Sequence, residues 1–290
     1  MLMLVKRNFL LYFRNRSGVF ASLLGALISF VLYLIFLKAN IKESWSQVPN
    51  TNQLLDMWLI GGTLGITGIT TTLAAYAQLV KDKESKVTQD LYITDLGSWG
   101  LQMSYLLSSV VIGFLMQIAV FAVMMTYFVL NDKISFAWGA APQVLLLMLL
   151  NACLTSLINA IIVSYFKSVD NLGRFASIVG AASGFLVGTY VPIGALPDLA
   201  QHLMKLTPST YIASLFRQVL MKDSMADAFA NNEKAAQHFE KIMGIRLHWD
   251  SLLTMEKTYY IVVVVLGLAF LFWLVQTALA NRRLKVKTAS

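Results

Sequence analysis

Charged residues and cysteine are scarce in this sequence of 290 residues. Only 13% of the residues are charged and 57% are hydrophobic, whereas ordinary soluble domains are about 25% charged. A compact soluble domain needs a polar surface, so this composition excludes a soluble globular enzyme and a disordered protein. The single cysteine, Cys153, lies in an apolar run, which excludes a disulfide framework and a cysteine-based metal site. The composition therefore predicts an integral membrane protein.

Ionisable side chains are nearly absent from six apolar stretches. Each stretch is long enough to cross a hydrocarbon core, which takes roughly 20 helical residues. Because lipid offers no hydrogen-bond partners to the backbone, each stretch must be helical. We therefore predict an all-α integral membrane protein with six transmembrane helices. Five spans fall within residues 18–195 and the sixth is residues 259–280; they are Gly18–Leu37, Met57–Val80, Tyr105–Leu130, Gln143–Phe166, Arg174–Ala195 and Tyr259–Ala280.

The distribution of lysine and arginine predicts the orientation of these spans. Basic residues gather in the two terminal segments and in the loops after the second and fourth spans, and they are few in the two short loops between. Cytoplasmic segments carry this excess in membrane proteins, and long loops escape the rule. We therefore expect both termini, including a basic tail at residues 281–290, to be cytoplasmic. Most of the basic residues behind the net charge of +8 then mark the cytoplasmic side of the membrane, so this charge does not predict a nucleic-acid partner.

Two cytoplasmic segments are strongly polar. In residues 1–17 leucine and phenylalanine alternate with Lys6, Arg7, Arg14 and Arg16, which is typical of a helix that lies in the membrane interface. A simple basic flank of the first span explains these residues equally well. The loop 81–100 mixes both signs of charge at high density, so it is either a solvated linker or a helix that docks on a cytoplasmic partner. Its charged residues are Lys81, Asp82, Lys83, Glu84, Lys86, Asp90 and Asp95.

The loop between the fifth and sixth predicted spans is long and has two parts. Residues 196–221 are apolar, interrupted by proline and too short to span, which predicts a re-entrant helical pair at the outer leaflet. Residues 222–258 are polar and predict a small cap outside the membrane.

Several kinds of chemistry are missing. The spans hold no acidic pair, and the sequence has no HExxH, no GxSxG and no GxxxxGK[ST] phosphate-binding loop. His202, His238 and His248 lie in the outer loop without cysteines or clustered carboxylates, so we predict no metal site and no catalytic residues. Proton-coupled carriers place ionisable residues at mid-membrane depth, so their absence also argues against proton coupling.

Small residues recur at four-residue spacing in two spans. Gly180, Gly184 and Gly188 follow one another in the fifth span, and Gly61 and Gly65 lie in the second. Small-xxx-small faces allow helix backbones to approach closely. These faces either pack helices within one chain or form a homodimer contact or a substrate path.

Three segments resemble the permease subunits of type-2 ATP-binding cassette exporters, a family of bacterial multidrug, lipid, peptide and toxin exporters. LVKRNFLLYFRNRSGVFASLLGALISFVLYLIFL is similar to that family's basic elbow helix and first span. KDKESKVTQDLYITDL takes the place of its charged loop after the second span. GFLVGTYVPIGALPDLAQHLMKLTPSTYIASLFRQVLM resembles its fifth span and re-entrant pair, with Arg217 in the second helix.

The resemblance implies a dimer of six-span subunits, formed with a second copy or a related permease in a bacterial cytoplasmic membrane. Each subunit would dock on a cytoplasmic ATPase, so two ATPase copies would bind ATP and Mg²⁺ and this chain would bind no cofactor. The cargo would be amphipathic or hydrophobic and would leave the cell between the subunits. The implied coupling residues are those of the charged loop with Gln89 and Tyr92, and a second contact at Lys167, Asp170 and Arg174. The implied path residues are Thr63, Thr67, Thr70, Ser183, Thr189 and Tyr190.

Three other interpretations remain open from the sequence. A secondary carrier driven by sodium can bind its ion with carbonyls and hydroxyls alone. A membrane-embedded enzyme needs a polar constellation at the interface, for which the sequence offers only loop carboxylates. A scaffold or immunity protein that transports nothing would use the charged loop only to bind a partner.

Overall fold

The computed structural model describes residues 1–92, 96–230 and 232–289, with no side chains beyond Asn281. The described residues are helical apart from turns, loops and one isolated antiparallel bridge between His248 and Leu252. The helices are α1 (Leu2–Arg14), α2 (Arg16–Ser22), α3 (Leu24–Leu32), a π-helical turn (Tyr33–Leu37), α4 (Lys38–Ser44), α5 (Thr51–Glu84), α6 (Val87–Tyr92), α7 (Gly97–Asp132), α8 (Ala141–Val163), α9 (Val169–Leu186), α10 (Asp198–Lys205), α11 (Pro208–Leu220), α12 (Lys222–Ala228), α13 (Glu233–Met243) and α14 (Met255–Ala289).

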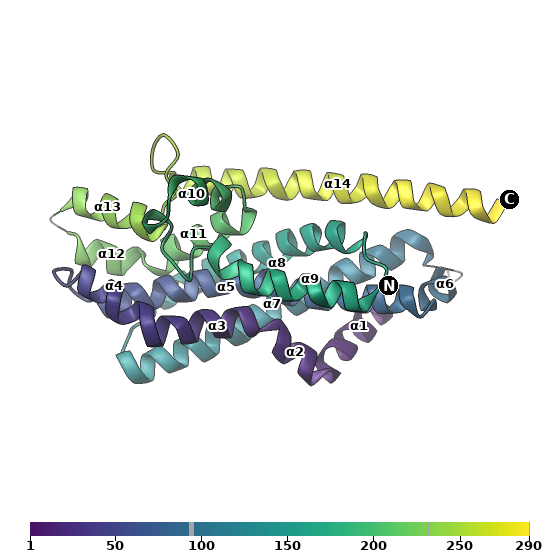
Figure 1. Ribbon diagram of the computed structural model, residues 1–290, viewed down its shortest axis with the longest axis horizontal. Coiled ribbons are helices and arrows are strands. Elements are labelled where there is room, and N and C mark those ends of the chain that lie inside the picture. The colour runs from purple at the N-terminus through teal and green to yellow at the C-terminus, as the bar shows by residue number, and fades with distance from the viewer. Residues whose placement is uncertain (93–95, 231, 290) are drawn as a thin grey trace.

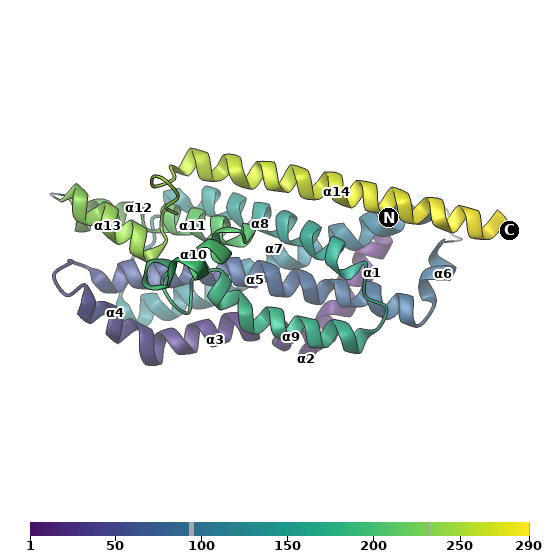
Figure 2. The same ribbon diagram turned by 45° about the horizontal axis from the view of Figure 1, so that its top comes forward.

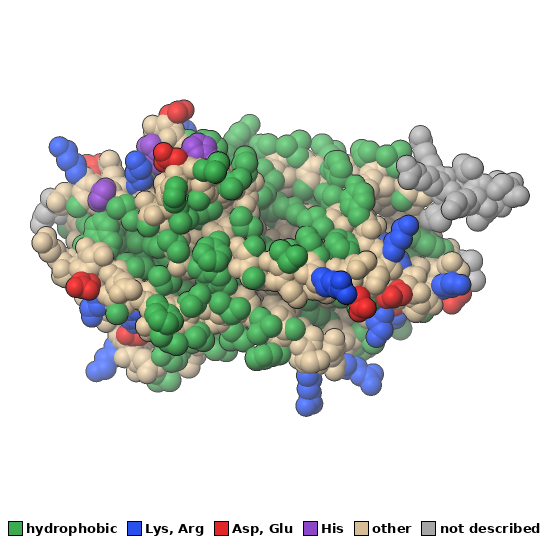
Figure 3. Space-filling model, viewed as in Figure 1, with side chains coloured by type: hydrophobic (Ala, Val, Ile, Leu, Met, Phe, Trp, Pro, Cys, Tyr) green, Lys and Arg blue, Asp and Glu red, His purple; other side chains and the backbone are tan. Residues whose placement is uncertain are grey.

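The helices form an elongated bundle with two distinct ends (Figure 1). Both termini and α6 lie at one end, which we call the termini end; α12 and α13 lie at the other, the cap end (Figures 1 and 2). On the face that Figure 3 shows, apolar side chains cover most of the surface between the ends, and most charged side chains lie toward the two ends. This distribution is that of a protein immersed in lipid across its middle.

Within the described part of the chain, five helical segments are long and apolar enough to cross a membrane. The predicted all-helical membrane fold is confirmed to that extent. The five segments are Leu24–Ser44, Thr51–Glu84, Gly97–Asp132, Trp138–Val163 and Met255–Asn281. They contain the second, third and last predicted spans and overlap the first and fourth. The first segment begins at Leu24 rather than Gly18, and the fourth ends at Val163 rather than Phe166.

The fifth predicted span, Arg174–Ala195, differs from the structure. The helix there, α9, ends at Leu186. Gly188 adopts a left-handed backbone with φ of 67°, and the amides of Thr189 and Tyr190 both donate to the Gly184 carbonyl. Such a glycine ends a helix, since residues with a Cβ rarely adopt this conformation. The apolar run to Ala195 therefore continues as a turn and a short 3-10 helix, Ile193–Ala195. A crossing by α9, which would bring the number of spans to six, stays a prediction.

Helix α5 is the centre of the bundle. Its spanning segment is almost entirely buried, whereas that of α14 is mostly exposed on the side of the bundle. Buried amides join α5 to α7 and α8: Asn151 donates to the Leu64 carbonyl at 3.1 Å and to Gln117 at 2.9 Å, and Asn159 donates to Thr72 at 2.8 Å. Hydrogen bonds of this kind hold helices together where lipid provides no hydrophobic drive between them.

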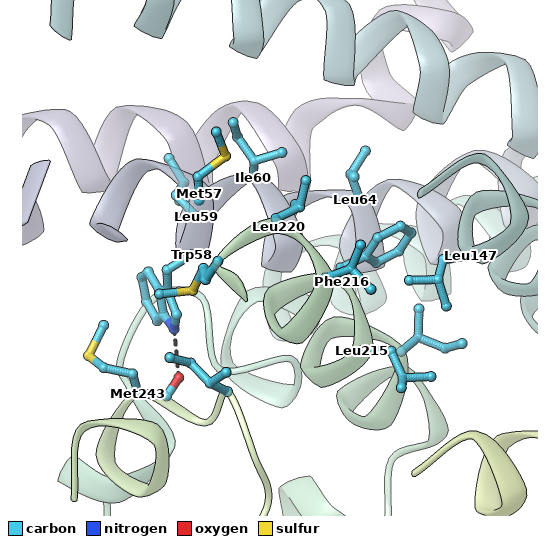
Figure 4. Close-up of a cluster of buried hydrophobic side chains, with 14 of the residues drawn as sticks. Met57, Trp58, Leu59, Ile60, Leu64, Leu147, Leu215, Phe216, Leu220 and Met243 are labelled. Carbon is cyan, nitrogen blue, oxygen red and sulfur yellow. Dashed lines mark hydrogen bonds between the residues drawn. The ribbon is translucent and has the colours of Figure 1, made fainter. Parts of the chain in front are cut away.

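Helix α11 packs against the cap-end half of α5. Gly61 and Gly65 of α5 leave room for it, because a Cβ at Gly61 would come within 3.1 Å of the Arg217 backbone nitrogen. Phe216 and Leu220 of α11 then join the apolar core, which Figure 4 shows on both sides of this contact. The small residues of the second predicted span thus serve packing within the chain.

The polar segment after α11 is tied to the same core. Phe239 and Met243 of α13 are fully buried, and the indole of Trp58 on α5 donates to the Met243 carbonyl at 2.6 Å (Figure 4). The predicted cap at residues 222–258 is therefore anchored on α5 through α13.

Candidate functional site

A buried ion pair joins α1 to the last turn of α5 at the termini end. The Arg7 guanidinium donates to both carboxylate oxygens of Asp82, at 2.7 and 2.9 Å. Gln78 and Tyr105 also donate to Asp82, at 2.7 and 2.5 Å, and only 3% of the Asp82 side chain is exposed. Bidentate charge-assisted bonds of this geometry are among the stronger polar contacts in proteins. The hydrogen bond to Asp82 raises the pKa of Arg7 above its ordinary value, which favours the charged guanidinium.

The pair fixes the position of the amphipathic helix. Asn8, also buried, donates to Ser108 on α7, which adds a second contact between α1 and the bundle. Lys6, Arg14 and Arg16 are exposed, so Arg7 alone of the four predicted basic residues points into the protein. The sequence grouped these four together, because amphipathic spacing does not reveal which one finds a buried partner.

Most other predicted coupling residues form an exposed charged face beside this pair. This face has two parts, the loop after α5 and the start of α9. Glu84 links them, because its carboxylate accepts a hydrogen bond from the Val169 amide at 3.1 Å. Lys83 and Tyr92 are half-buried, and Asp95 lies outside the described residues. The exposed members are Lys81, Glu84, Lys86, Gln89, Asp90, Lys167, Asp170 and Arg174.

The predicted path residues are all buried within the single chain. Thr67 and Thr70 donate to carbonyls one turn earlier in α5, at 2.8 and 3.2 Å, and Ser183 donates to the Gly180 carbonyl at 3.0 Å. Their hydroxyls satisfy their own helices, which is common for serine and threonine in membrane helices. The structure places Thr63, Thr67, Thr70, Ser183, Thr189 and Tyr190 inside the bundle rather than on its outer surface.

The predicted glycine face of α9 makes contacts within the chain. A Cβ at Gly184 would collide with the Tyr190 ring, and a Cβ at Gly25 on α3 would lie 3.0 Å from the Gly180 carbonyl oxygen. These close approaches serve helix packing, while Gly188 ends α9 as described above. A dimer contact through α9 stays a prediction.

Arg217 is fully buried at the junction of α5, α9, α11 and α13. Its guanidinium donates to the Gly188 carbonyl at 2.9 Å and, more weakly at 3.4 Å, to the carbonyls of Val187, Trp58 and Gly244. Its charge also lies 4.7 Å from the centre of the Trp58 ring. The carbonyls of Val187, Gly188 and Gly244 lie at the C-terminal ends of α9 and α13, where helix dipoles favour a positive charge. Arg217 therefore ties α11 to three other helices, α5, α9 and α13.

A second buried ionic cluster lies near the cap end of α5. Asp56 has no exposed surface; it accepts from the Tyr33 hydroxyl at 2.5 Å and pairs with Lys38 at 2.9 Å. Lys38 also pairs with Asp132 of α7 at 2.7 Å. The sequence does not mark these residues as a cluster, because Lys38 and Asp56 belong to different helices that a loop separates.

Taken together, the apolar surface, the five helical segments long enough to span and the buried polar contacts between helices define a multi-pass membrane protein. The sequence matches the family model of the ABC-2 type transporter over residues 1–221. The chain therefore belongs to the ABC-2 type transporter family, as the resemblance predicted. No curated protein and no solved structure matches it. The family match ends at Met221, immediately before the polar segment that begins with α12.

Proposed function

We propose that this chain is the membrane subunit of an ATP-driven exporter. Family membership supports a transport permease, and the contact of Arg7 with Asp82 is the observation that carries the coupling mechanism. In this proposal two cytoplasmic ATPase subunits bind and hydrolyse ATP with Mg²⁺. The permease works as a dimer in a bacterial cytoplasmic membrane and moves an amphipathic or hydrophobic cargo outward.

The exposed charged face is the proposed docking site for the ATPase. It offers Lys81, Lys86 and Asp90 to a partner, and both signs of charge favour one orientation of docking. Asp82 lies one residue from Lys81, but its carboxylate faces inward to Arg7. A displacement of the docked loop would therefore pull on α1 and on α5 together.

The cargo path would open where α9 and α11 meet α5. Thr63 and Thr189 are buried there, and neither hydroxyl has a hydrogen-bond partner within the described residues. Small residues on α5 let these elements approach closely. Opening the path there would break the contacts of Arg217 with Trp58 on α5 and with Val187 and Gly188 after α9. A sixth crossing through α9 and a re-entrant pair of α10 and α11 complete the proposed architecture.

The experiment is transport in vesicles that contain the chain with and without its ATPase. We expect cargo to move only with the ATPase and ATP, and the purified chain alone to hydrolyse no ATP. Asp82→Asn should keep the ATPase bound and abolish transport, because it removes the charge that holds Arg7. Asp223→Asn, an exposed carboxylate at the cap end, is the matched control and should transport normally. Transport that persists without ATP and collapses with a sodium gradient would overturn the proposal.

A further inference from the structure

We propose that the cap end carries a binding site for a phosphate group. A depression of about 530 Å³ lies between α13 and the turn that follows it. Basic and imidazole side chains dominate its lining: Lys234, His238, Lys241, Arg246 and His248. Figure 3 shows lysine, arginine and histidine side chains gathered at this end. This inference is independent of the proposed exporter function.

One wall is a face of α13 whose orientation the core fixes. Lys234, His238 and Lys241 are spaced by four and three residues, so they project from the same side of the helix. Phe239 and Met243 are buried on its other side. The buried residues therefore fix the orientation of α13, so that its basic face stays directed toward the depression.

The opposite wall is a turn held by its own hydrogen bonds. The Arg246 guanidinium donates to the Leu253 carbonyl at 2.9 Å, to the Leu252 carbonyl at 3.2 Å and to Glu240 at 3.2 Å. The bridge between His248 and Leu252 closes this turn. Both walls are thus formed before any ligand arrives, which lowers the cost of ordering on binding.

The depression has more positive than negative charge. Glu240 neutralises Arg246, and within the described residues no ion pair engages Lys234 or Lys241. Burial lowers the pKa of His248 from its ordinary value, and the nearby Lys241 and Lys205 lower it further, against the opposing effect of Asp250. The positive potential of the neighbouring lysines disfavours a second positive charge on the imidazole. The same positive potential would favour a bound anion.

Phosphate fits this set of groups. Two ammonium groups on one wall and an imidazole on the other can each donate to a different oxygen of the same phosphate. The volume exceeds that of inorganic phosphate alone, so the phosphate can belong to a larger soluble molecule or to a lipid headgroup. Both sources present the same chemistry to the site.

The test is isothermal titration of the purified full-length chain in detergent with inorganic pyrophosphate at low salt. We expect saturable binding with one site per chain, weakened at least about tenfold in the double variant Lys234→Ala/Lys241→Ala, since each lost charge-assisted bond is a large part of the affinity. Lys222→Ala removes an exposed lysine of the same cap outside the depression and should bind as the unmodified chain does. Loss of thermal stability in the double variant would be checked in parallel by its unfolding temperature.

A lipid source is separated from a soluble one by a second arm. The chain is placed in phosphatidylcholine nanodiscs with and without phosphatidic acid, and pyrophosphate binding is measured again. Competition by phosphatidic acid identifies a headgroup as the ligand, and undiminished binding identifies a soluble phosphate compound. Absence of pyrophosphate binding, or equal affinity in the double variant and in Lys222→Ala, would overturn the proposal. Neither measurement involves an ATPase, so either failure leaves the exporter proposal unaffected.

Discussion

Asp82 and Asp56 lie near opposite ends of α5, and both carboxylates are buried with a cation and a tyrosine hydroxyl. Their cations differ. Asp82 pairs with Arg7, which belongs to an amphipathic helix and is one-third exposed. Asp56 pairs with Lys38, which is shared with Asp132 and is held among membrane helices.

The difference assigns a different mechanical role to each end. At the termini end the ion pair connects the bundle to a surface helix, so a movement outside the bundle can reach α5. At the cap end the ions hold α4, α5 and α7 to one another, so they resist relative movement. The middle of α5 has no charge and is held by amide and hydroxyl contacts, such as that between Asn159 and Thr72.

The largest loss of stability is expected from Asp82→Ala. It leaves the Arg7 guanidinium, the Gln78 amide and the Tyr105 hydroxyl without their shared acceptor. Breaking a buried pair costs about 3–5 kcal/mol, and the partial exposure of Arg7 reduces this to about 2–3 kcal/mol. Equilibrium unfolding in detergent measures the loss. A loss below about 1 kcal/mol would mean that the pair does not hold α1 to the bundle.

Asp56→Ala should cost less, about 1–2 kcal/mol, because Lys38 keeps Asp132 and only the Tyr33 hydroxyl loses its acceptor. The same unfolding measurement applies. Removing both acids, Asp56→Ala with Asp132→Ala, leaves Lys38 without a partner and should destabilise more than the sum of the single changes. A loss in the double variant equal to the sum of the two single losses would contradict the sharing of Lys38 between Asp56 and Asp132.

A double-mutant cycle isolates the contact at the termini end. Arg7→Ala and Asp82→Ala should be coupled by about 1–2 kcal/mol, since they remove the two halves of one interaction. Lys6→Ala combined with Asp82→Ala is the matched cycle, because Lys6 is exposed on the same helix. Its coupling energy should be near zero. Equal coupling in both cycles would assign the effect to general charge rather than to the bidentate contact.

The smallest effect on stability is expected at the exposed charged face. Lys86→Ala and Asp90→Ala should change the free energy of unfolding by no more than about 0.5 kcal/mol, as surface changes usually do. Their effect should fall on ATPase binding, measured by co-purification. Variants that unfold the chain, or that bind the ATPase unchanged, would remove this face from the proposed docking site.

The sequence predicts the membrane class, the helices and the family well, because long apolar runs and basic flanks report directly on lipid. It does not predict the partner of Asp82. Arg7 is 75 residues away, and contacts at that separation leave no periodic trace. Its charged neighbours made Asp82 resemble one more exposed residue of the loop, although its position in the last turn of α5 turns it inward.

The predicted end of α9 shows a second limit. The apolar composition of residues 187–195 suits a span, but α9 ends at Leu186 and Gly188 adopts a left-handed conformation. Likewise, spacing cannot tell a glycine that packs a helix from one that lines a path. Gly184 meets the ring of Tyr190, a residue only six positions further along, through a turn that the pattern does not reveal.

The most direct test of the account is affinity purification of the chain from its native membrane, with mass spectrometry of the proteins that accompany it. We predict that a soluble protein with a GxxxxGK[ST] loop co-purifies in about equal amount. It should be retained by the Lys222→Ala variant and lost when Lys81, Lys86 and Asp90 are replaced by alanine. Recovery of the chain alone as an intact oligomer would contradict the account, because no other source of ATP-driven movement would remain.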